Sequence, residues 1–464
     1  MGHPLKNLIL LPLLFFILFA CRKESFTSNA DFLLRTSIDS LHFDTVFTST
    51  GSVTQQIRIF NDHDKGIHIN SIRLSGGALS PFKININGEP GPEALQVDLD
   101  ANDSAYIFVK VYIDPTATNL PFLIRDSIEI AYNGNKKYIQ LDAYGRNAHF
   151  LRNRIITSDE SWDNDLPYVI LGGLVVDSNA TLTINNGCHI YLHSDAPFIV
   201  HGSMQVKGND SSRVLFLGDR TDDPYRNFPG SYPGLIFSQA SKNNILQFCT
   251  IENAYQGILL QDNLSGGTKL TLQETVIDNA YDAGIISVNS SISARNILVS
   301  NCGKSVELIN GGNYEFIHCT VAAYSNNFIQ HKDPLLLLSD NSEQNNSAVY
   351  TMNALFRNCI FWAEKNGMVD NDIIVSRTNS ATFNVIFDHI LWDVKSNPPN
   401  ASVLSVWNMP PEFDSINISD RFYNFHLKSS SPAIDAGIDA GIKMDLDGKP
   451  RPVGLPDLGC YERQ

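Results

Sequence analysis

A short motif repeats in the middle of the chain, and its spacing restricts the folds that are possible. Residues 251–255 (IENAY) reappear as 277–281 (IDNAY) and, more faintly, as 299–302 (VSNC), at intervals of 26 and 22 residues. Each copy alternates apolar and polar residues, which indicates a half-buried strand and not a helix. Strand repeats of this length predict a solenoid of stacked coils, with a run of unstacked strands as the alternative. The apolar first residue of each copy, here called its anchor, is Ile251, Ile277 or Val299. Continued along the chain, the register places later anchors at Val321, Phe361 and Leu391.

The repeat predicts two columns of side chains. Equivalent residues of stacked strands lie about 4.8 Å apart, so Asn253, Asn279 and Asn301 are expected to form a structural ladder at a turn. Asparagine also tolerates the left-handed backbone that a sharp corner needs. A second, inward column two residues before each anchor is predicted to contain Cys249, Thr275, Ile297, Cys319, Cys359 and His389.

The repeat with its turn asparagine resembles the right-handed parallel β-helix of the pectate-lyase-like fold. The resemblance covers residues 149–424, and the glycine-punctuated strands between Gly172 and Val206 are similar to the opening coils of such proteins. The predicted fold class is therefore all-β, with an N-terminal immunoglobulin-like β-sandwich followed by a right-handed parallel β-helix.

Charge and cysteine content exclude several classes of function. The 464 residues include 49 acidic and 34 basic ones, a formal net charge of −15. Nucleic acids and anionic lipid surfaces are bound through clustered Lys and Arg, so neither is expected as a partner of a charged face. Seven cysteines without a C-x-x-C pair lack the spacing of zinc and thioredoxin motifs. The apolar surroundings of Cys188, Cys249, Cys302, Cys319 and Cys359 predict buried free thiols, with disulfides as the alternative.

Residues 1–20 have the composition of a targeting segment. Lys6 precedes an apolar run, residues 8–19, that is too short for a usual membrane span. The run ends in LFAC at 18–21, which resembles the bacterial lipobox and implies a lipoprotein cleaved before Cys21, acylated there and anchored in the outer-membrane bilayer, facing the cell surface or the periplasm. A plain signal peptide or an uncleaved anchor is the alternative. Residues 21–38 are expected to be a polar tether.

Residues 39–148 consist of short alternating segments separated by turn dipeptides. Asn61-Asp62, Gly76-Gly77, Asn87-Gly88 and Asn133-Gly134 punctuate seven predicted strands, which indicates a β-sandwich. The segment 42–47 resembles the immunoglobulin-like modules of secreted Bacteroidota proteins. The resemblance implies a spacer or adaptor, and the Cys–Trp–Cys core of true immunoglobulin domains is missing from this sequence.

A polar loop interrupts the coil rhythm at residues 217–233. Asp219, Asp222 and Asp223 are candidate Ca²⁺ ligands, since Ca²⁺ prefers carboxylate oxygens. Tyr225 and Tyr232 are candidate platforms for sugar rings. Loops that project from a rigid scaffold often carry function. The alternative is a solvated loop that covers one face.

Two tryptophans are predicted on the outside of neighbouring coils. Trp362 and Trp392 each follow an anchor by one residue and are therefore expected to point outward. Together they are a candidate sugar platform, although cover by a loop or by the C-terminal segment is the favoured interpretation. The ladder positions after Asn301 are Ala323, Ala363 and Asp393, so the asparagine column ends in the middle coils.

Residues 425–464 carry a second family signature. SPAIDAG at 431–437, DLDG at 445–448 and GCYE at 459–462 resemble the C-terminal motif of bacterial surface β-helix proteins of the choice-of-anchor type, with Cys460 in place of the usual alanine. Asp445 and Asp447 have the spacing of a calcium turn without the other ligands of an EF-type loop. A capping role on the last coil, hiding its unpaired edge, is favoured.

The predicted function is that of a non-catalytic cell-envelope lipoprotein whose β-helix binds a glycan or serves as a scaffold. The alternative is a polysaccharide lyase or glycoside hydrolase acting on a cell-wall or dietary polysaccharide. Fold alone supplies no chemistry, no catalytic residue is assigned, and Ca²⁺ is the one candidate cofactor. Three or more ionisable residues converging beside the 219–232 loop would favour the enzyme, and a groove of Asn, Ser and aliphatic residues would favour binding.

Overall fold

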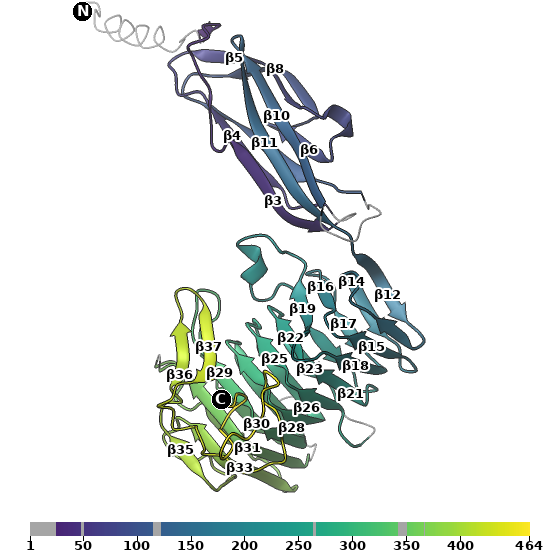
Figure 1. The fold of residues 1–464 in the computed structure, drawn as a ribbon, viewed down its shortest axis with the longest axis vertical. Helices are drawn as coiled ribbons and strands as arrows, with labels where there is room; N and C mark the ends of the chain where they lie inside the picture. The colour runs from purple at the N-terminus through teal and green to yellow at the C-terminus, as the bar shows by residue number, and fades with distance from the viewer. Residues whose placement is uncertain (1–24, 48–50, 115–121, 263–265, 342–349, 366) are drawn as a thin grey trace, which may run out of the picture. The chain divides into compact units, whose positions relative to one another are not determined.

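The computed structural model describes residues 25–47, 51–114, 122–262, 266–341, 350–365 and 367–464. This part of the chain is all-β, with two single 3-10 turns, η1 (Gly77–Leu79) and η2 (Tyr225–Asn227), and no α-helix (Figure 1). The chain divides into two units, Met1–Asn147 and Ala148–Gln464. The predicted leader and Cys21 lie outside the described residues. Within those residues, no helix has the length and hydropathy to span a membrane.

The N-terminal unit consists of two sheets that share one hydrophobic core. Alternate residues such as Ile57 and Ile59 of one sheet and Ile128 and Ile130 of the other are fully buried in it. Asn133 and Gly134 both have positive φ angles, 46° and 77°, as a two-residue hairpin between β10 and β11 requires. The first sheet contains β1 (Phe26–Thr27), β5 (Gly66–Leu74), β10 (Phe122–Tyr132), β11 (Asn135–Arg146) and β3 (Ser40–Phe47), with β8 (Glu93–Leu99) beside β5; the second contains β2 (Arg35–Thr36), β4 (Gln55–Phe60), β9 (Ser104–Val111), β6 (Phe82–Ile86) and β7 (Glu89–Pro90).

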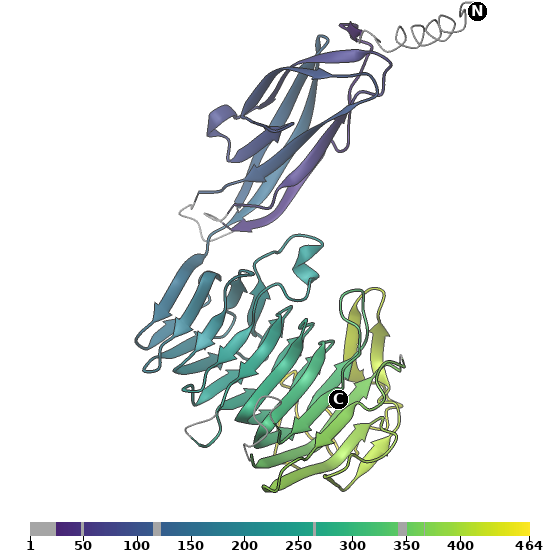
Figure 2. The ribbon, with the colours of Figure 1, turned by 180° about the vertical axis from the view of Figure 1, so that it is seen from behind.

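The C-terminal unit is built from the large parallel sheet of a β-helix, β12 to β35, in which each strand pairs in parallel with its equivalent in the next coil (Figures 1 and 2). The repeat motifs lie on consecutive strands of one face, namely β22 (Cys249–Glu252), β25 (Val276–Asp278), β27 (Leu298–Ser300), β29 (Thr320–Ala323), β31 (Met352–Ala363) and β33 (Phe383–Trp392). The other strands are β12 (His149–Ile156), β13 (Glu160–Trp162), β14 (Tyr168–Val176), β15 (Thr181–Asn185), β16 (His189–Leu192), β17 (Phe198–Val200), β18 (Ser203–Lys207), β19 (Val214–Gly218), β20 (Leu235–Phe237), β21 (Asn244–Gln247), β23 (Gln256–Leu260), β24 (Leu270–Gln273), β26 (Ala283–Arg295), β28 (Lys304–Ile317), β30 (Leu336–Ser339), β32 (Ile373–Ser376), β34 (Ser402–Val403) and β35 (Val406–Asn408).

The interior of the coils is a continuous apolar core. The anchors Ile251, Ile277, Val299, Val321 and Phe361 are all buried in it, and each pairs in register with the anchor of the next coil. The column two residues before them is also buried. The cysteines among the described residues are free, buried thiols at Cys188, Cys249, Cys302, Cys319, Cys359 and Cys460.

The predicted register is wrong by one residue in the last repeat. Ile360 pairs with Leu391, so Trp392 and not Leu391 follows Phe361 in the interior column. Because side chains alternate with a period of two, a one-residue shift exchanges inside and outside. Trp392 is consequently 1% exposed and packs against Phe387, at a centroid distance of 5.2 Å. By the same shift, Ile390 takes the position predicted for His389 in the second column, and Val394 takes that predicted for Asp393 in the ladder column.

The C-terminal segment packs along a side of the β-helix. It begins with the hairpin of β36 (Phe413–Asn417) and β37 (Phe422–Leu427). The outward residues Leu298, Ala322, Ile360 and Leu391 belong to four successive coils and form a second hydrophobic cluster with this segment. Trp362 is half-buried and packs against the same cluster. The segment's contributions to the cluster are Phe413, Phe425, Leu427, Ala433, Leu446, Leu458 and Cys460.

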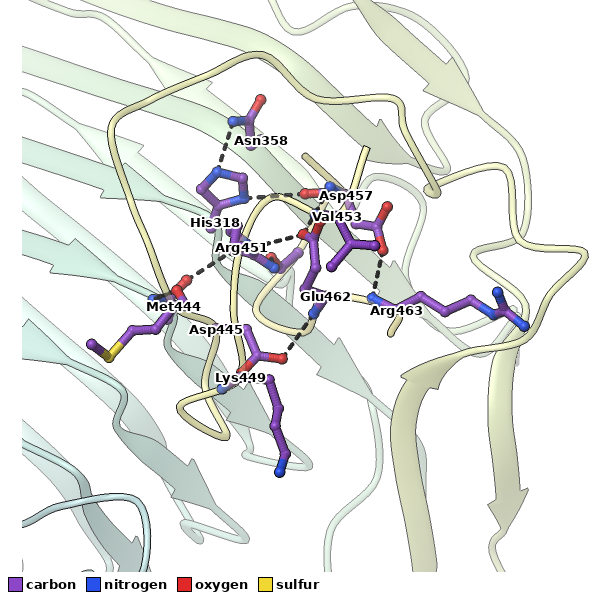
Figure 3. A network of polar contacts seen from close by, with 12 residues as sticks. His318, Asn358, Met444, Asp445, Lys449, Arg451, Val453, Asp457, Glu462 and Arg463 are labelled. Atoms are coloured by element: carbon purple, nitrogen blue, oxygen red, sulfur yellow. Dashed lines mark hydrogen bonds and ion pairs between the residues drawn. The ribbon is translucent and has the colours of Figure 1, made fainter. Parts of the chain in front are cut away.

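A buried ion pair within this segment is hydrogen-bonded to a coil residue, Asn296 (Figure 3). Arg451 and Glu462 are both fully buried, and the guanidinium Nε donates to Glu462 Oε2 at 2.9 Å. The two other guanidinium nitrogens donate to Asn296 Oδ1 and the Gly459 carbonyl, each at 3.0 Å. Glu462 also accepts backbone N–H groups from Val453 and Asp457. Each charge therefore has several hydrogen bonds, which a buried pair needs to offset its desolvation.

His318 contributes a neutral link to the same network. Asn358 Nδ2 donates to His318 Nε2 at 3.0 Å, and His318 Nδ1 lies 3.1 Å from the Asp457 carbonyl, to which it donates. Burial lowers the pKa of His318 from 6.5 to about 2, and the charge of Arg451 acts in the same direction. Asn296 and Asn358 occupy the equivalent position in the neighbouring coils.

We predict that His318→Asn makes stability less sensitive to acid. Between pH 6.5 and about 2 the unfolded histidine binds a proton that the folded one does not, so this group alone lowers the free energy of unfolding by about 1.4 kcal/mol for each unit that the pH falls in that window. Urea unfolding at pH 7, 6 and 5 should give a steeper loss for the wild type than for the variant. Equal slopes would contradict a neutral, buried His318.

Candidate functional site

The acidic residues of the projecting loop do not converge. Asp219 Oδ2 lies 2.6 Å from His193 Nδ1, Asp222 accepts two hydrogen bonds from Arg220, at 2.7 and 2.9 Å, and Asp223 pairs with Arg226 at 2.7 Å. Burial raises the pKa of Asp219, and His193 opposes that rise. Within the described residues, no group of three or more His, Cys, Asp or Glu is arranged to hold a metal ion. The loop carboxylates are thus engaged in separate ion pairs.

The two loop tyrosines have different environments. Tyr225, on η2, is 43% exposed, and the Arg220 guanidinium lies 3.8 Å from its ring centroid. Tyr232 is 1% exposed in the interior of the coils, and its hydroxyl donates to the Phe216 carbonyl at 3.1 Å. The interpretation of Tyr232 as a sugar platform is therefore wrong. Its backbone bridges to Ala254 as one more strand residue, so its side chain takes the inward parity.

The ladder asparagines attach the loop to the coils. Asn253, Asn279 and Asn301 all have left-handed φ angles, 64°, 55° and 53°. Asn279 Nδ2 donates to Asn253 Oδ1 at 2.6 Å and to the Asn227 carbonyl at 3.2 Å, and Asn253 Nδ2 donates to the Arg226 carbonyl at 2.9 Å. Asn301 donates instead to Asp278 Oδ1, at 3.1 Å. Two asparagines of this column, Asn253 and Asn279, thus hold the projecting loop in place.

Asp445 and Asp447 have separate structural partners. Asp445 is 1% exposed and accepts backbone N–H groups from Asp447, Lys449 and Glu462 at 2.8–3.0 Å. Asp447 pairs with His426 Nε2 at 2.9 Å, and this hydrogen bond lowers the pKa of Asp447. The Asp445 carboxylate thus closes the DLDG turn by accepting backbone N–H groups (Figure 3).

A charged cluster that the sequence reasoning missed lies beneath the loop. Glu252 and Asp278 are paired residues of β22 and β25, and Asp278 Oδ1 accepts a hydrogen bond from Ser300 Oγ at 2.6 Å. Burial raises the pKa of both carboxyl groups, and the charge of Asp278 adds to the rise at Glu252. Arg421, between β36 and β37, opposes both rises and donates to the Asn227 carbonyl at 2.9 Å. In the sequence, these two carboxylates could have been found as the residues directly before the ladder asparagines Asn253 and Asn279.

Two polar atoms of this cluster have no hydrogen-bond partner. Among the described residues they are Asn279 Oδ1 and Arg421 Nε. Aromatic rings of the loop and of a later coil also pack together, with the ring centroids of Phe228 and Phe328 4.8 Å apart. Buried polar atoms are rarely left unpaired, so this cluster has the capacity to bind water or a polar ligand.

An open groove lies on a different face of the coils. It has a volume of about 540 Å³ and crosses the second halves of β26 and β28 and the first halves of β31 and β33. Asn353 Nδ2 donates to Asn313 Oδ1 at 3.0 Å across neighbouring coils. The groove contains one ionisable side chain at its surface, Glu315. Two in-register columns form its floor: Ser291, Asn313, Asn353 and Asn384, and Ser293, Glu315, Leu355 and Ile386.

Comparisons with known proteins give no family. No protein-family model matches the chain, and no curated protein matches it. Among solved structures, the catalytic unit of a thermostable GH87 alpha-1,3-glucanase from Streptomyces thermodiastaticus aligns over 76% of this chain and 87% of its own, with 9% identity and a TM-score of 0.22.

Two further solved structures align with shorter parts of the chain. A family 123 glycoside hydrolase from Clostridium perfringens aligns over 26% of each chain, with 11% identity and a TM-score of 0.19, so the chain spans about a quarter of that enzyme. The PapD-like domain 7 of human CEP192 aligns over 27% of this chain and 92% of its own, with 11% identity and a TM-score of 0.17. Likenesses at these scores carry no argument about what this chain does.

We predict that Ca²⁺ leaves the stability of the protein unchanged. A specific site filled at a hundred times its Kd would stabilise the fold by about 2.7 kcal/mol, and the candidate ligands Asp222, Asp223 and Asp445 are already engaged. Melting curves with millimolar CaCl₂ and with EDTA should therefore coincide. A rise in Tm of several degrees with Ca²⁺, lost in Asp445→Asn, would contradict this interpretation.

Proposed function

We propose that the protein is a non-catalytic, glycan-binding lipoprotein of the bacterial outer membrane, anchored through acylated Cys21. In this proposal the N-terminal unit is an immunoglobulin-like spacer, and the C-terminal segment is a choice-of-anchor-type motif that stabilises a right-handed β-helix. Two sheets around one core support the first assignment, and the packing of residues 413–464 along the coils supports the second. The orientation towards the cell surface or the periplasm stays open.

The groove on β26, β28, β31 and β33 is the observation that carries glycan binding. Asn313, Asn353 and Asn384 present one amide per coil in register, about 4.8 Å apart. Amides both donate and accept hydrogen bonds, as the hydroxyl groups of a saccharide require. Leu355 and Ile386 in the neighbouring column supply apolar surface for the C–H faces of sugar rings.

The composition of the groove favours binding over hydrolysis. Glycoside hydrolases use two carboxyl groups that flank the scissile bond. Glu315 is the one carboxylate among the residues that line this groove, and Ser293 Oγ lies 3.5 Å from it. A polymer in the groove would thus meet hydrogen-bonding groups without a second acid or base.

We predict that the double variant Asn353→Ala/Asn384→Ala weakens saccharide binding roughly tenfold, since each lost hydrogen bond contributes about 0.5–1.5 kcal/mol. Retardation of the purified protein in native gels containing dextran, laminarin, mannan or xylan measures the affinity. Asn185→Ala is the matched control, because Asn185 lies on the same sheet several coils away. Equal retardation of the wild type and the double variant would remove the groove from the proposal.

The Glu252–Asp278 pair favours a second candidate, a glycoside hydrolase. The two residues are paired on neighbouring strands, which are about 4.8 Å apart, so both carboxyl groups belong to one face of the sheet. Retaining enzymes use such a pair of carboxyl groups, roughly 5–5.5 Å apart. A raised carboxyl pKa is also what a general acid needs. The pair lies beside the 219–232 loop with Arg421, which is the arrangement expected of the enzyme.

Turnover separates the two candidates. We expect no release of reducing ends from the same four polysaccharides over a day with micromolar protein, because loop and hairpin enclose the carboxyl pair. Product that disappears in both Glu252→Gln and Asp278→Asn, but not in Glu315→Gln, would establish the hydrolase and overturn the non-catalytic proposal.

A further inference from the structure

We infer that Tyr255 and Tyr281, together with the polar pairs beside them, form a second saccharide-binding site for a neutral sugar. Both rings are exposed, by 46% and 52%. Their centroids are 5.8 Å apart and their planes differ by 30°, so they form a short, nearly continuous aromatic surface. The site shares the glycan-binding role with the proposed function but no residue with its groove.

The repeat itself creates this surface. Each tyrosine ends one copy of the five-residue motif, two residues after a ladder asparagine, so in-register stacking places the two rings side by side. The third copy has Gly303 at this position, which leaves the next coil without a side chain there. Gly230 of the projecting loop approaches the pair, and a Cβ on it would lie 3.4 Å from Tyr281 Cβ. The loop therefore approaches the rings at a residue that has no side chain to cover them.

Two polar pairs lie next to the rings in sequence and are connected to each other. Gln256 Nε2 donates to Asp282 Oδ2 at 2.7 Å. Lys304 Nζ lies 3.4 Å from Glu307 Oε2, and the Lys304 backbone N–H donates to the Asp282 carbonyl at 2.7 Å. All four side chains are half-buried, so the surroundings hold them while leaving part of each open to solvent.

The chemistry of these six residues fits a neutral sugar. An exposed aromatic surface stacks on the apolar C–H face of a pyranose. The amide–carboxylate and ammonium–carboxylate pairs present fixed donors and acceptors together, as neighbouring hydroxyl groups need. The two carboxylates, Asp282 and Glu307, outnumber the one cation, Lys304, which disfavours a uronic acid or a sulfated sugar.

The charged groups of Asp282, Lys304 and Glu307 are close enough to influence one another. Burial raises the pKa of Glu307, the adjacent Lys304 opposes the rise, and the charge of Asp282 adds to it. The three groups thus act on one another electrostatically, as a site of connected polar side chains should.

Affinity electrophoresis of the purified protein tests the site, with dextran, laminarin, mannan, xylan and polygalacturonate as probes. We expect at least one neutral polymer to retard the wild type. Tyr255→Ala and Tyr281→Ala should each weaken that affinity about five- to tenfold, a tenfold change corresponding to about 1.4 kcal/mol. Tyr255→Phe and Tyr281→Phe should retain it, because the ring and not the hydroxyl stacks. Tyr144→Ala, at a tyrosine 49% exposed in the other unit, is the control and should bind like the wild type.

Specific outcomes would overturn the inference. They are wild-type retardation in both alanine variants, retardation by polygalacturonate alone, or no retardation by any neutral polymer. The groove is tested separately by Asn353→Ala/Asn384→Ala. If that variant loses no affinity while the tyrosine variants do, the groove fails and the tyrosine site stands; the reverse result removes the tyrosine site alone. Unchanged melting curves confirm that the alanine variants are folded.

Discussion

In-register pairing of parallel strands is the constraint on which the C-terminal unit depends. Since each coil hydrogen-bonds to the next at a fixed spacing, one choice of residue in the repeat becomes a column along the molecule. The inward column at Ile251 is apolar throughout and fills the core. The outward column beside it changes from Glu252 and Asp278 to Ser300, Ala322 and Trp362. The position is the same in each coil, but its chemistry changes along the axis.

That change determines where the C-terminal segment packs. Leu298, Ile360 and Leu391 offer a continuous apolar face on the later coils, which would be exposed without the segment. Arg451 and Glu462 lie at the contact, fully buried, and removing either partner from such a pair costs about 3–5 kcal/mol. The ion pair joins two residues of the segment, and the hydrogen bond from Arg451 to Asn296 connects the pair to the coils, while the apolar face supplies the driving force. The charged cluster at Glu252 and Asp278 lies at the edge of the covered area.

The sequence predicts what is periodic and fails where coil length varies. The all-β class, the parallel coils and the positions of Asn253 and Asn279 follow from local pattern. Trp392 was placed on the wrong side because one extra residue inverts the alternation. The lateral course of the C-terminal segment, and the approach of Arg421 to Asp278, depend on contacts between residues far apart in the chain. No local pattern contains that information, so the cluster was missed although its carboxylates belong to the repeat.

The projecting loop separates an enclosed polar cluster from an open aromatic surface within one motif. Asn253 and Asn279 bind the carbonyls of Arg226 and Asn227, which fixes the loop over the carboxyl groups of Glu252 and Asp278. A few residues further along the same motif, Gly230 leaves Tyr255 and Tyr281 exposed. A polymer too large to pass under a loop held at both asparagines would still have access to the tyrosines. Access, and not the presence of carboxylates, is therefore the reason that we propose the tyrosines, and not the carboxyl pair, as the surface for binding.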